Sequence, residues 1–590
     1  MTLAHPSLNR SIFLLLAASL LASTLLVIGG ATRPASVAAA VTHTLYVDGK
    51  HGSDANAGDS WQEALKTINA AARKVPRGPT GAGWNVIVRG YTDYIYRERP
   101  IPGGWNRNGT SASPIVFQAE GWSAGATDYV RPVVSGGVRA PGAGKSWSPT
   151  STGGVWYASW STKPRNFAGA GSAYDTALFQ NVTTWLWQRR SLADLRNSPK
   201  AGGFWYDGAA NRLYVAAKGG VNPNTVDIEI PTNNGFYFSG DHGGSWVEVR
   251  GFEIRHAAMG VAFVNGVDHS SAVDNVAYAN DHVGFHTGGR NLASGYDPAV
   301  GNVFLRNSGA YNTVQAFKVE AGTQDAVICD NTAARNALQG IKVQGPITSG
   351  DHRVTRDIEL CGNLVHHQTY ARPDHVYENT TGITISNGAR NVYVHHNDVW
   401  SNNIGIHVTQ QGGYGSPIVG LRVTRNRVWN NTRFGLDTRD GSPHASDGTG
   451  SMASTFNLYW GNGVGILVDH GSVNKVFNHD TVFDNDSVGF KVGCGCNTDV
   501  AKATIKNSLV TNNGGWGIQV LGHGRAYVSY TGLPGNGAGA ISGSASKTAI
   551  NTRPAGYLSV DPDHASFLRI GAGSYQYTAG PGDTPIGARY

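Results

Sequence analysis

Apolar residues in the central part of the chain recur in a fixed frame that is not helical. An Asn is followed five residues later by a second Asn, and a Gly or Ala shortly after opens a strand with apolar residues at alternate positions. Short, Gly-punctuated segments with a period of two predict β-strands joined by turns. The Asn pairs are Asn275/Asn280, Asn307/Asn312, Asn331/Asn336, Asn397/Asn402, Asn426/Asn431 and Asn507/Asn512. The strand-opening residues are Gly284, Ala316, Gly340, Gly405, Gly435, Gly489 and Gly517.

The length of this repeat predicts a solenoid. Successive strand-opening residues lie mostly 23 to 32 residues apart, within the range of solenoid repeats. The recurrent Asn suits turn corners, where its side chain bonds nearby backbone and can stack on the Asn of the next coil. We therefore predict an all-β chain that folds as a right-handed parallel β-helix.

The first 41 residues have the pattern of a secretory signal peptide. Arg10 precedes a largely apolar run over residues 12–28, and small residues follow at 35–40. An uncleaved membrane anchor is the alternative, because the run is nearly long enough to span a bilayer. Both interpretations place the rest of the chain outside the cytoplasm, so we expect a secreted, extracellular protein with no other membrane association.

The remainder of the chain divides by composition. Ser60 and Glu63 form a capping box at the start of an apolar-faced helix that extends to Val75, and this helix is expected to cover the open end of the solenoid. A later stretch loses the Asn repeat and is rich in Trp, Tyr and Pro, which predicts a small sandwich-like insert. The expected parts are 42–137 (N-terminal cap and first coils), 138–245 (β-rich insert), 246–530 (main β-helix) and 531–590 (C-terminal cap).

Composition agrees with a repetitive β-protein. The chain has 79 Gly among 590 residues and 15% charged residues, against roughly 25% in an average globular chain. Its net charge of +7 falls to +5 when Arg10 and Arg33 leave with the leader. This weakly basic balance is compatible with acidic glycans. No basic helix with interleaved aromatic residues is present, so we expect no nucleic-acid partner, and we expect a monomer.

Two cysteines occupy equivalent places in consecutive repeats. Cys329 and Cys361 each precede the first corner residue, Asn331 or Asn363, by two positions. They should therefore lie about one strand spacing of ~4.8 Å apart, inside the Cα range of a disulfide. A disulfide and a pair of stacked free thiols both remain open. Cys494 and Cys496 lack a second Cys or His pair at zinc spacing and are interpreted as loop residues.

The central residue of each strand should face away from the core and carry any chemistry. His286, Lys318 and Lys342 would then form a row about 5 Å apart. Two neighbouring ammonium groups lower each other's pKa, which provides a free amine as a base beside a cation that stabilises an enolate. Read coil by coil, the row is His286, Lys318, Lys342, Thr384, His407, Asp437, Leu467, Lys491 and Gln519.

This row leads to a first hypothesis and three alternatives. The first is a lyase that cleaves an acidic, uronate-containing polysaccharide by β-elimination, with Lys318 or Lys342 as base and His286 assisting. One alternative is a glycoside hydrolase with Asp437, Asp440 or Asp469 as the carboxyl pair. Another is a non-catalytic glycan-binding adhesin. The third alternative is that the row is an ordinary solvent-exposed polar face with no function of its own. The expected substrate-binding residues are His407, Asp437, Arg439 and Lys491.

Two further motifs have simple interpretations. Tyr278, Trp400 and Trp429 share one position of the repeat, where an inward-facing corner is favoured over a platform for sugar. The pairs at 366–367 and 395–396 are all His and are interpreted as turn residues rather than a metal site.

Several segments resemble known families. The start, YVDGKHGSDANAG followed by VIVRGYTDYIYRE, resembles secreted right-handed β-helix proteins of the pectin-lyase-like class. The strands AFKVEAG at 316–322, GIKVQG at 340–345 and GFKVG at 489–493 resemble the strand of polysaccharide lyase family nine that bears its Lys base.

The segment GNVFLRNSGAYNT at 301–313 resembles the one that leads into the calcium site of that family. The resemblance implies a Ca²⁺ cofactor. The family's acidic pair is replaced here by Val314 and Gln315, and Lys318 stands at its aspartate position. Asp281 and Glu320 are then the candidate metal ligands.

Overall fold

The protein is described here by a computed structural model. It covers residues 41–142, 144–164, 177–293, 295–346, 351–368, 380–410, 417–439, 450–494 and 500–588. The predicted leader lies outside these residues except for its last position. Among the residues covered, no helix is both long enough and apolar enough to cross a membrane.

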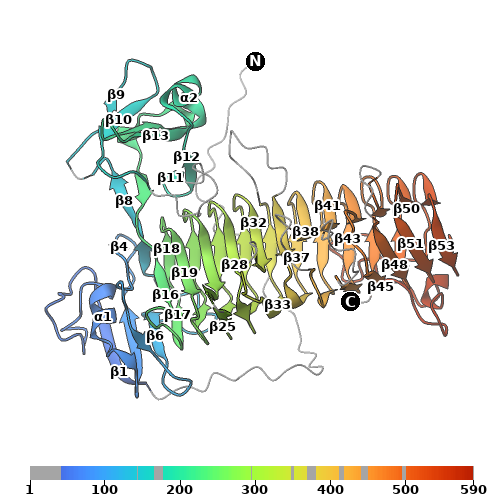
Figure 1. Cartoon of the computed structure of the whole chain (residues 1–590), viewed down its shortest axis with the longest axis horizontal. Helices are drawn as coiled ribbons and strands as arrows, with labels where there is room; N and C mark the ends of the chain where they lie inside the picture. The colour runs from blue at the N-terminus through green and yellow to red at the C-terminus, as the bar shows by residue number, and fades with distance from the viewer. Residues whose placement is uncertain are drawn as a thin grey trace. The chain divides into compact units, whose positions relative to one another are not determined.

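Three parallel sheets share the coils of the chain between them. One coil contributes β36 (Arg390–His395), β37 (Asp398–Trp400) and β38 (Ile404–Thr409) to the three sheets in turn. Each strand pairs in parallel with its counterpart in the next coil. Figure 1 shows the coils from β18 to β53 side by side. This is the predicted parallel β-helix.

We call the sheet that contains β38 the site sheet. It has 12 strands. Besides β38 these are β16 (Phe236–Ser239), β19 (Met259–Val264), β22 (Val283–Gly288), β28 (Gln315–Val319), β32 (Gln339–Gln344), β35 (Thr381–Ser386), β41 (Phe434–Arg439), β44 (Val464–Val468), β47 (Phe490–Val492), β50 (Trp516–Val520) and β52 (Gly539–Ser542).

The sheet that contains β37 is called the corner sheet and has 12 short strands. Besides β37 these are β4 (Ile95–Arg97), β7 (Val133–Ser135), β18 (Glu253–Arg255), β21 (Val276–Tyr278), β27 (Ser308–Ala310), β31 (Thr332–Ala334), β34 (Leu364–His366), β40 (Arg427–Trp429), β43 (Leu458–Trp460), β46 (Thr481–Phe483) and β49 (Leu509–Thr511).

The sheet that contains β36 is called the long sheet and has 17 strands. Besides β36 these are β1 (Val41–Val47), β3 (Gly83–Val88), β6 (Ile115–Ala119), β17 (Val247–Arg250), β20 (Ser271–Val273), β25 (Ala299–Val300), β26 (Val303–Leu305), β29 (Thr323–Gln324), β30 (Val327–Cys329), β33 (Arg356–Cys361), β39 (Leu421–Thr424), β42 (Met452–Thr455), β45 (Lys475–Asn478), β48 (Lys502–Lys506), β51 (Arg525–Ser529) and β53 (Ala545–Thr548).

The insert contains two antiparallel four-stranded sheets. One consists of β8 (Gly137–Ala140), β11 (Ala177–Gln180), β12 (Thr184–Trp187) and β15 (Ile228–Pro231), and the other of β9 (Ser148–Pro149), β10 (Trp156–Ser159), β13 (Gly203–Asp207) and β14 (Arg212–Ala216). A short helix, α2 (Leu192–Asn197), accompanies them. Trp147, Leu186 and Phe204 are buried in the core of the insert, so these apolar side chains pack against one another rather than face solvent.

Two ladders of amide side chains connect the coils at their corners, as predicted. At most steps, the side-chain oxygen of one residue accepts two hydrogen bonds from the ladder residue of the preceding coil, one from its backbone N and one from its side-chain nitrogen. Asn402 donates both to Asn431 Oδ1, at 3.0 and 3.1 Å. One ladder runs Asn275, Asn307, Asn331, Asn363, Asn397, Asn426, Asn457, Asp480, and the other Asn280, Asn312, Asn336, Gln368, Asn402, Asn431, Asn462, Asn485, Asn513, Asn536.

The predicted pair at the last repeat was wrong by one residue. Ser508 and Asn513 occupy the ladders there, as Asp480 N donates to Ser508 Oγ and Asn485 N donates to Asn513 Oδ1. Asn507 and Asn512 instead adopt left-handed backbone, with φ of 49° and 57°. Asn is suited to both the ladder position and the left-handed turn position, because its side chain can bond a neighbouring coil or its own turn. Residue type alone therefore does not distinguish the two positions.

The strand-opening Gly has a packing cause. A Cβ on Gly405 would lie 2.5 Å from Val428 Cγ1 and 2.6 Å from the carbonyl oxygen of Gly435. Where Ala316 replaces this Gly, the corner strand of the same coil has Gly309, at which a Cβ would lie 2.6 Å from the Ala316 side chain.

The predicted N-terminal helix is shorter than expected. Ser60 Oγ does accept from Glu63 N at 3.3 Å, but α1 spans only Ile68–Lys74 and is capped by Thr67, whose side chain accepts from Ala70 N. Leu65 forms a bridge with Val47 in the first strand, and residues 59–63 before it form bends and a turn rather than helix. Apolar residues of α1 are buried in the main core, as a lid on the first coils requires.

The aromatic residues of the corner sheet do not face inward, contrary to the prediction. Trp400 and Trp429 alternate with Val399 and Val428, which lie in the core. On the outer face Trp400, Trp429 and Trp460 stack with ring centroids 4.9 Å apart. Because neighbouring rings cover one another's faces, this ladder offers edges rather than flat platforms to a ligand.

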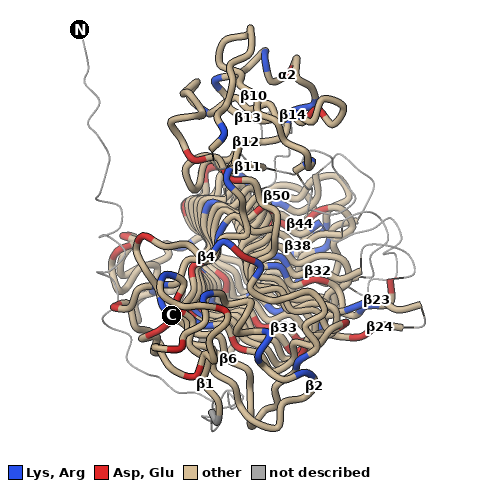
Figure 2. The backbone as a smooth tube through the Cα atoms, turned by 90° about the vertical axis from the view of Figure 1, so that its left-hand side faces the viewer, with Lys and Arg blue, Asp and Glu red and all other residues tan. Residues whose placement is uncertain are grey.

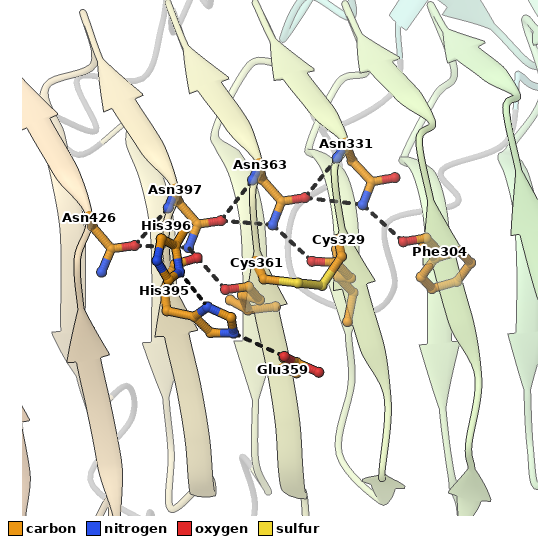
Figure 3. Close-up of a disulfide and its surroundings, with 12 residues drawn as sticks. Phe304, Cys329, Asn331, Glu359, Cys361, Asn363, His395, His396, Asn397 and Asn426 are labelled. Atoms are coloured by element: carbon orange, nitrogen blue, oxygen red, sulfur yellow. Dashed lines mark hydrogen bonds and ion pairs between the residues drawn. A yellow bond between two sulfur atoms is a disulfide. The ribbon is translucent and has the colours of Figure 1, made fainter. Parts of the chain in front are cut away.

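The two cysteines form a disulfide. Cys329 and Cys361 are partners in the register of β30 and β33, with Cα atoms 4.5 Å apart. Of the two alternatives left open by the sequence, the crosslink is the one the structure shows (Figure 3).

Candidate active site

The central residues of the site sheet form one continuous row. Each is the register partner of the next, and the apolar residues on either side of them lie in the core. The row is His286, Lys318, Lys342, Thr384, His407, Asp437, Leu467, Lys491 and Gln519. The predicted alignment of three basic residues is therefore present.

The expectation that this row projects into solvent was wrong for most of its residues, although Lys318, Lys491 and Gln519 are partly exposed. Lys342 and His407 are each 8% exposed, and Asp437 is fully buried. Arg439 donates to the Asp437 carboxylate, and Leu467, the register partner of Asp437 on the next coil, packs with Phe434. The row faces away from the core, but it lies beneath other side chains, and burial controls its protonation.

Glu320 connects two residues predicted to be catalytic. Its Oε2 lies 2.8 Å from His286 Nε2, and its Oε1 lies 3.2 Å from Lys318 Nζ. Burial would raise the pKa of Glu320, but Lys318 and His286 outweigh burial and hold the pKa well below its usual range. Burial lowers the pKa of His286, against the opposing effect of Glu320. Lys318 is therefore engaged in an ion pair.

Lys342 is the more suitable amine. Burial, reinforced by the charge of Lys318, lowers the pKa of Lys342 to about 8. Sequence reasoning missed a neighbour, His282, whose pKa is held well below its usual value by burial and then by Lys318. His282 lies at the turn before β22, outside the repeated strand positions, and no spacing signal distinguishes it.

The candidate calcium ligands are engaged elsewhere. Asp281 Oδ1 accepts from Ala177 N of the insert at 2.8 Å, and Glu320 pairs with Lys318 and His286. Within the described residues, one group brings three His, Cys or acidic ligand atoms within 4.8 Å of one another, and it contains neither residue. No observation therefore supports a Ca²⁺ site on Asp281 and Glu320.

A second group surrounds Asp437. Arg439 Nε donates to Asp437 Oδ1 at 3.0 Å, and His407 Nε2 lies 3.8 Å from Oδ2. Burial raises the pKa of Asp437 to about 6, Arg439 opposes it, and Asp469 adds to the rise. Burial and the charge of Arg439 lower the pKa of His407 to about 3, so its ring is neutral near pH 7.

Asp437 and Asp469 form a pair of carboxyl groups on adjacent coils. Asp437 is the register partner of Leu467, and Asp469 follows two residues later. A strand spacing of ~4.8 Å and a rise of ~3.3 Å per residue put their Cα atoms about 8 Å apart. Asp437 Oδ2 and Asp469 Oδ1 are buried, and neither has a hydrogen-bond partner in the part of the chain that is described.

Glu320 lies too far away to join this pair, and Asp440, the third candidate carboxylate, lies outside the described residues. Glu320 follows Lys318, whose strand lies four strands from that of Asp437, or about 19 Å along the sheet. Lys491, predicted to bind substrate, lies two strands beyond Asp437.

An apolar and cationic wall adjoins the pair. Phe434 packs with Ile404, Val464 and Leu467, and the guanidinium groups of Arg433 and Arg439 lie 5.1 and 5.4 Å from its ring centroid. Sequence reasoning missed Phe434, although its place directly before Gly435 puts it in an outward column of the repeat.

No protein-family model and no curated protein matches the sequence. The resemblance to polysaccharide lyase family nine thus has no support at the level of the whole chain. Several solved structures are similar in fold. A structure of XylC in complex with xylose matches at 14% identity, with 88% of each chain covered and a TM-score of 0.55.

Two further structures match with lower TM-scores. A structure described as a glycoside hydrolase matches at 10% identity, covering 86% of this chain and 96% of the other, with a TM-score of 0.44. The A-module of Azotobacter vinelandii mannuronan C-5 epimerase AlgE4 matches at 12% identity, covering 55% of this chain and 85% of its own, with a TM-score of 0.38. At these identities the likeness concerns the fold.

Proposed function

We propose that this protein is a carbohydrate-active enzyme that hydrolyses glycosidic bonds, with Asp437 as general acid and Asp469 as base or nucleophile. The observation that carries the proposal is the pair of buried carboxyl groups on neighbouring coils, each with an oxygen that lacks a hydrogen-bond partner among the described residues. Burying such oxygens is costly, and structures retain them where a ligand or a reaction uses them.

The chemistry follows from the environment of each group. A carboxyl whose pKa is about 6 keeps its proton in mildly acidic solution and can transfer it to the leaving glycosidic oxygen. A second carboxylate several ångströms away can activate water or attack the anomeric carbon. Arg439 holds Asp437 in place through Oδ1 and leaves Oδ2 for the substrate. His407, which is neutral, can orient a sugar hydroxyl.

Two further observations are compatible with this proposal. XylC, whose fold the chain shares, is described with a bound sugar, xylose. The Cys329–Cys361 disulfide suits an oxidising compartment, which supports the proposal that residues 1–41 direct secretion.

The decisive experiment compares isosteric variants. We expect Asp437→Asn and Asp469→Asn each to lower kcat/KM on a panel of aryl glycosides and oligosaccharides by at least about 10³-fold, since each removes an essential proton-transfer or nucleophilic group. Asp398→Asn, which changes a carboxylate on the outer face of the corner sheet, should leave kcat/KM unchanged. Full activity in both site variants would refute the assignment.

A second candidate function rests on Lys342. Its pKa of about 8 and its register neighbour Lys318 suit abstraction of a proton α to a uronate carboxylate, the lyase reaction. The two candidates respond oppositely to pH. Hydrolysis with Asp437 as acid should decline above about pH 6, whereas elimination by Lys342 should rise toward about pH 8.

The products also separate the candidates. A lyase acting on an anionic polysaccharide generates an unsaturated, ultraviolet-absorbing end, and Lys342→Met should abolish it. A hydrolase generates reducing ends alone, and these should persist in Lys342→Met. A protein that binds the polysaccharide and generates neither product would be an adhesin.

A further inference from the structure

The outer face of the long sheet carries a compact group of metal-binding residue types around the disulfide. Cys329, Cys361 and His395 are successive register partners on β30, β33 and β36. Glu359 lies two residues before Cys361 on the same strand, so its side chain emerges on the same face. Figure 3 shows Glu359 and His395 bonded to each other beside the disulfide.

The distances match a small coordination site. A ligand atom from each of Cys329, Glu359 and Cys361 lies within 4.8 Å of the other two. A tetrahedral metal with metal–sulfur bonds of about 2.3 Å needs its ligand atoms roughly 3.7 Å apart. The two sulfurs must therefore move apart once their bond is broken. The carboxylate is already close enough.

The surroundings of Glu359 are organised as metal sites require. His395 Nε2 lies 2.9 Å from Glu359 Oε1, and His395 Nδ1 lies 2.9 Å from His396 Nδ1. The ring of Tyr393 stacks on that of His395, with centroids 4.0 Å apart. Such partners fix the direction of a ligand carboxylate. Cys329 is buried, but Cys361 is partly exposed and the Glu359 side chain is 43% exposed, which gives an ion a path to the sulfurs.

We propose that reduction of the Cys329–Cys361 disulfide converts this place into a binding site for Zn²⁺ or another thiophilic divalent cation, with Cys329 Sγ, Cys361 Sγ and a Glu359 oxygen as ligands and His395 as a positioning residue. A dithiol supplies two electrons and two protons, the S–S bond breaks into two thiols, and the dithiol becomes a disulfide. Metal binding then releases the two thiol protons. Water completes the coordination.

The consequence is an exchange of one crosslink for another. In the oxidised protein a covalent bond connects two coils of the long sheet, and in the reduced protein the cation would connect the same two strands. Because the folded coils hold the ligands together and the unfolded chain does not, the metal should bind the folded state more tightly and stabilise the reduced protein by mass action. The proposal does not depend on the reaction proposed for the site sheet.

The test uses the full chain in a Cys494→Ser/Cys496→Ser background, so that Cys329 and Cys361 supply all the thiols. The protein is reduced with a dithiol, freed of reductant without air and titrated with Co²⁺ and Zn²⁺. We expect one equivalent of Co²⁺ to produce a thiolate-to-cobalt charge-transfer band, Zn²⁺ to displace it, and the oxidised protein to show no band. Zn²⁺ should also raise the melting temperature of the reduced protein.

Variants distinguish this site from adventitious thiolate binding. Glu359→Gln should weaken Zn²⁺ binding at least tenfold, and His395→Gln should weaken it 10- to 100-fold. Asp357→Asn, a carboxylate on the same strand outside the group, should bind like the parent. The proposal is overturned if the reduced protein shows no band, if Glu359→Gln binds as tightly as the parent, or if reduction removes the β-sheet circular dichroism signal.

Discussion

Arg439 donates its Nε to Asp437 Oδ1 at 3.0 Å, and this bond adjusts the acidity of the proposed general acid. Burial raises the pKa of Asp437 to about 6, and the charge of Arg439 keeps it from rising further. Removing the cation should therefore raise the pKa of Asp437 and extend its protonated form to higher pH.

We predict that Arg439→Gln moves the alkaline limb of the kcat/KM profile, which begins near pH 6, upward by about one pH unit or more. The quantity measured is the pH of half-maximal activity, because the variant will also bind substrate less well. Arg427→Gln, on the corner sheet, is the matched control and should leave the limb in place. A shift to lower pH would contradict the assignment of Asp437 as the acid.

Asp480 occupies an amide position of the first ladder and should make stability depend on pH. Its Oδ1 accepts from Asn457 N at 2.8 Å and from Asn457 Nδ2 at 3.0 Å. Elsewhere in this ladder the side-chain nitrogen donates to a backbone carbonyl, as Asn457 does to Val423, but an ionised carboxylate has no proton to donate. Burial raises the pKa of Asp480 to about 7, against the opposing bonds from Asn457 and Ser454.

The folded state thus holds this proton more tightly than the unfolded chain. Stability is greatest below the ordinary pKa near 4, declines as pH rises, and levels off above about pH 7. We predict that Asp480→Asn raises the free energy of unfolding at pH 8 by at least about 1 kcal/mol and changes it little at pH 4. Urea unfolding at both pH values measures this, with the exposed Asp486→Asn as control. A loss of stability at pH 8 would refute the interpretation.

Gly405 should not tolerate a methyl group. A Cβ there would contact Val428 Cγ1 at 2.5 Å and a backbone oxygen at 2.6 Å, so neighbouring strands would have to move. We expect Gly405→Ala to cost about 1–3 kcal/mol of unfolding free energy, which denaturant titration can measure. Gly81→Ala, where a Cβ would meet nothing within 4 Å, should cost much less. Equal effects would show that the coils can adapt.

The Trp ladder should act in stability rather than in sugar binding. Trp429 stacks between Trp400 and Trp460, and both of its faces are covered. We predict that Trp429→Leu lowers the melting temperature, with a cost of about 1–3 kcal/mol for two lost stacking pairs, and leaves KM unchanged. A raised KM with an unchanged melting temperature would restore the sugar-platform hypothesis.

Figure 2 shows basic and acidic residues interspersed over the described backbone, so charge alone does not identify the site. The sequence predicted the alignment of this row because side-chain direction alternates along every strand and the coils repeat. Sequence reasoning favoured Lys318 and Lys342 over Asp437 and Asp469, because neighbouring residues of one type in the row can be recognised from the sequence, whereas their burial cannot. Asp437 is fully buried, and this burial raises its pKa while Arg439 opposes the rise.

The sequence by itself determined the repeat, the parallel β-helix and the register of the outward row, because hydrophobic period, Gly and Asn are local properties of each coil. Only the tertiary structure shows which side chains contact one another. It shows that Cys329 and Cys361 are bonded and that Glu320 pairs with Lys318 and His286. It also shows that the Trp ladder lies outside the core. Burial and ion pairing depend on the packing of distant segments, and these contacts assign chemical roles to residues that the pattern can only place.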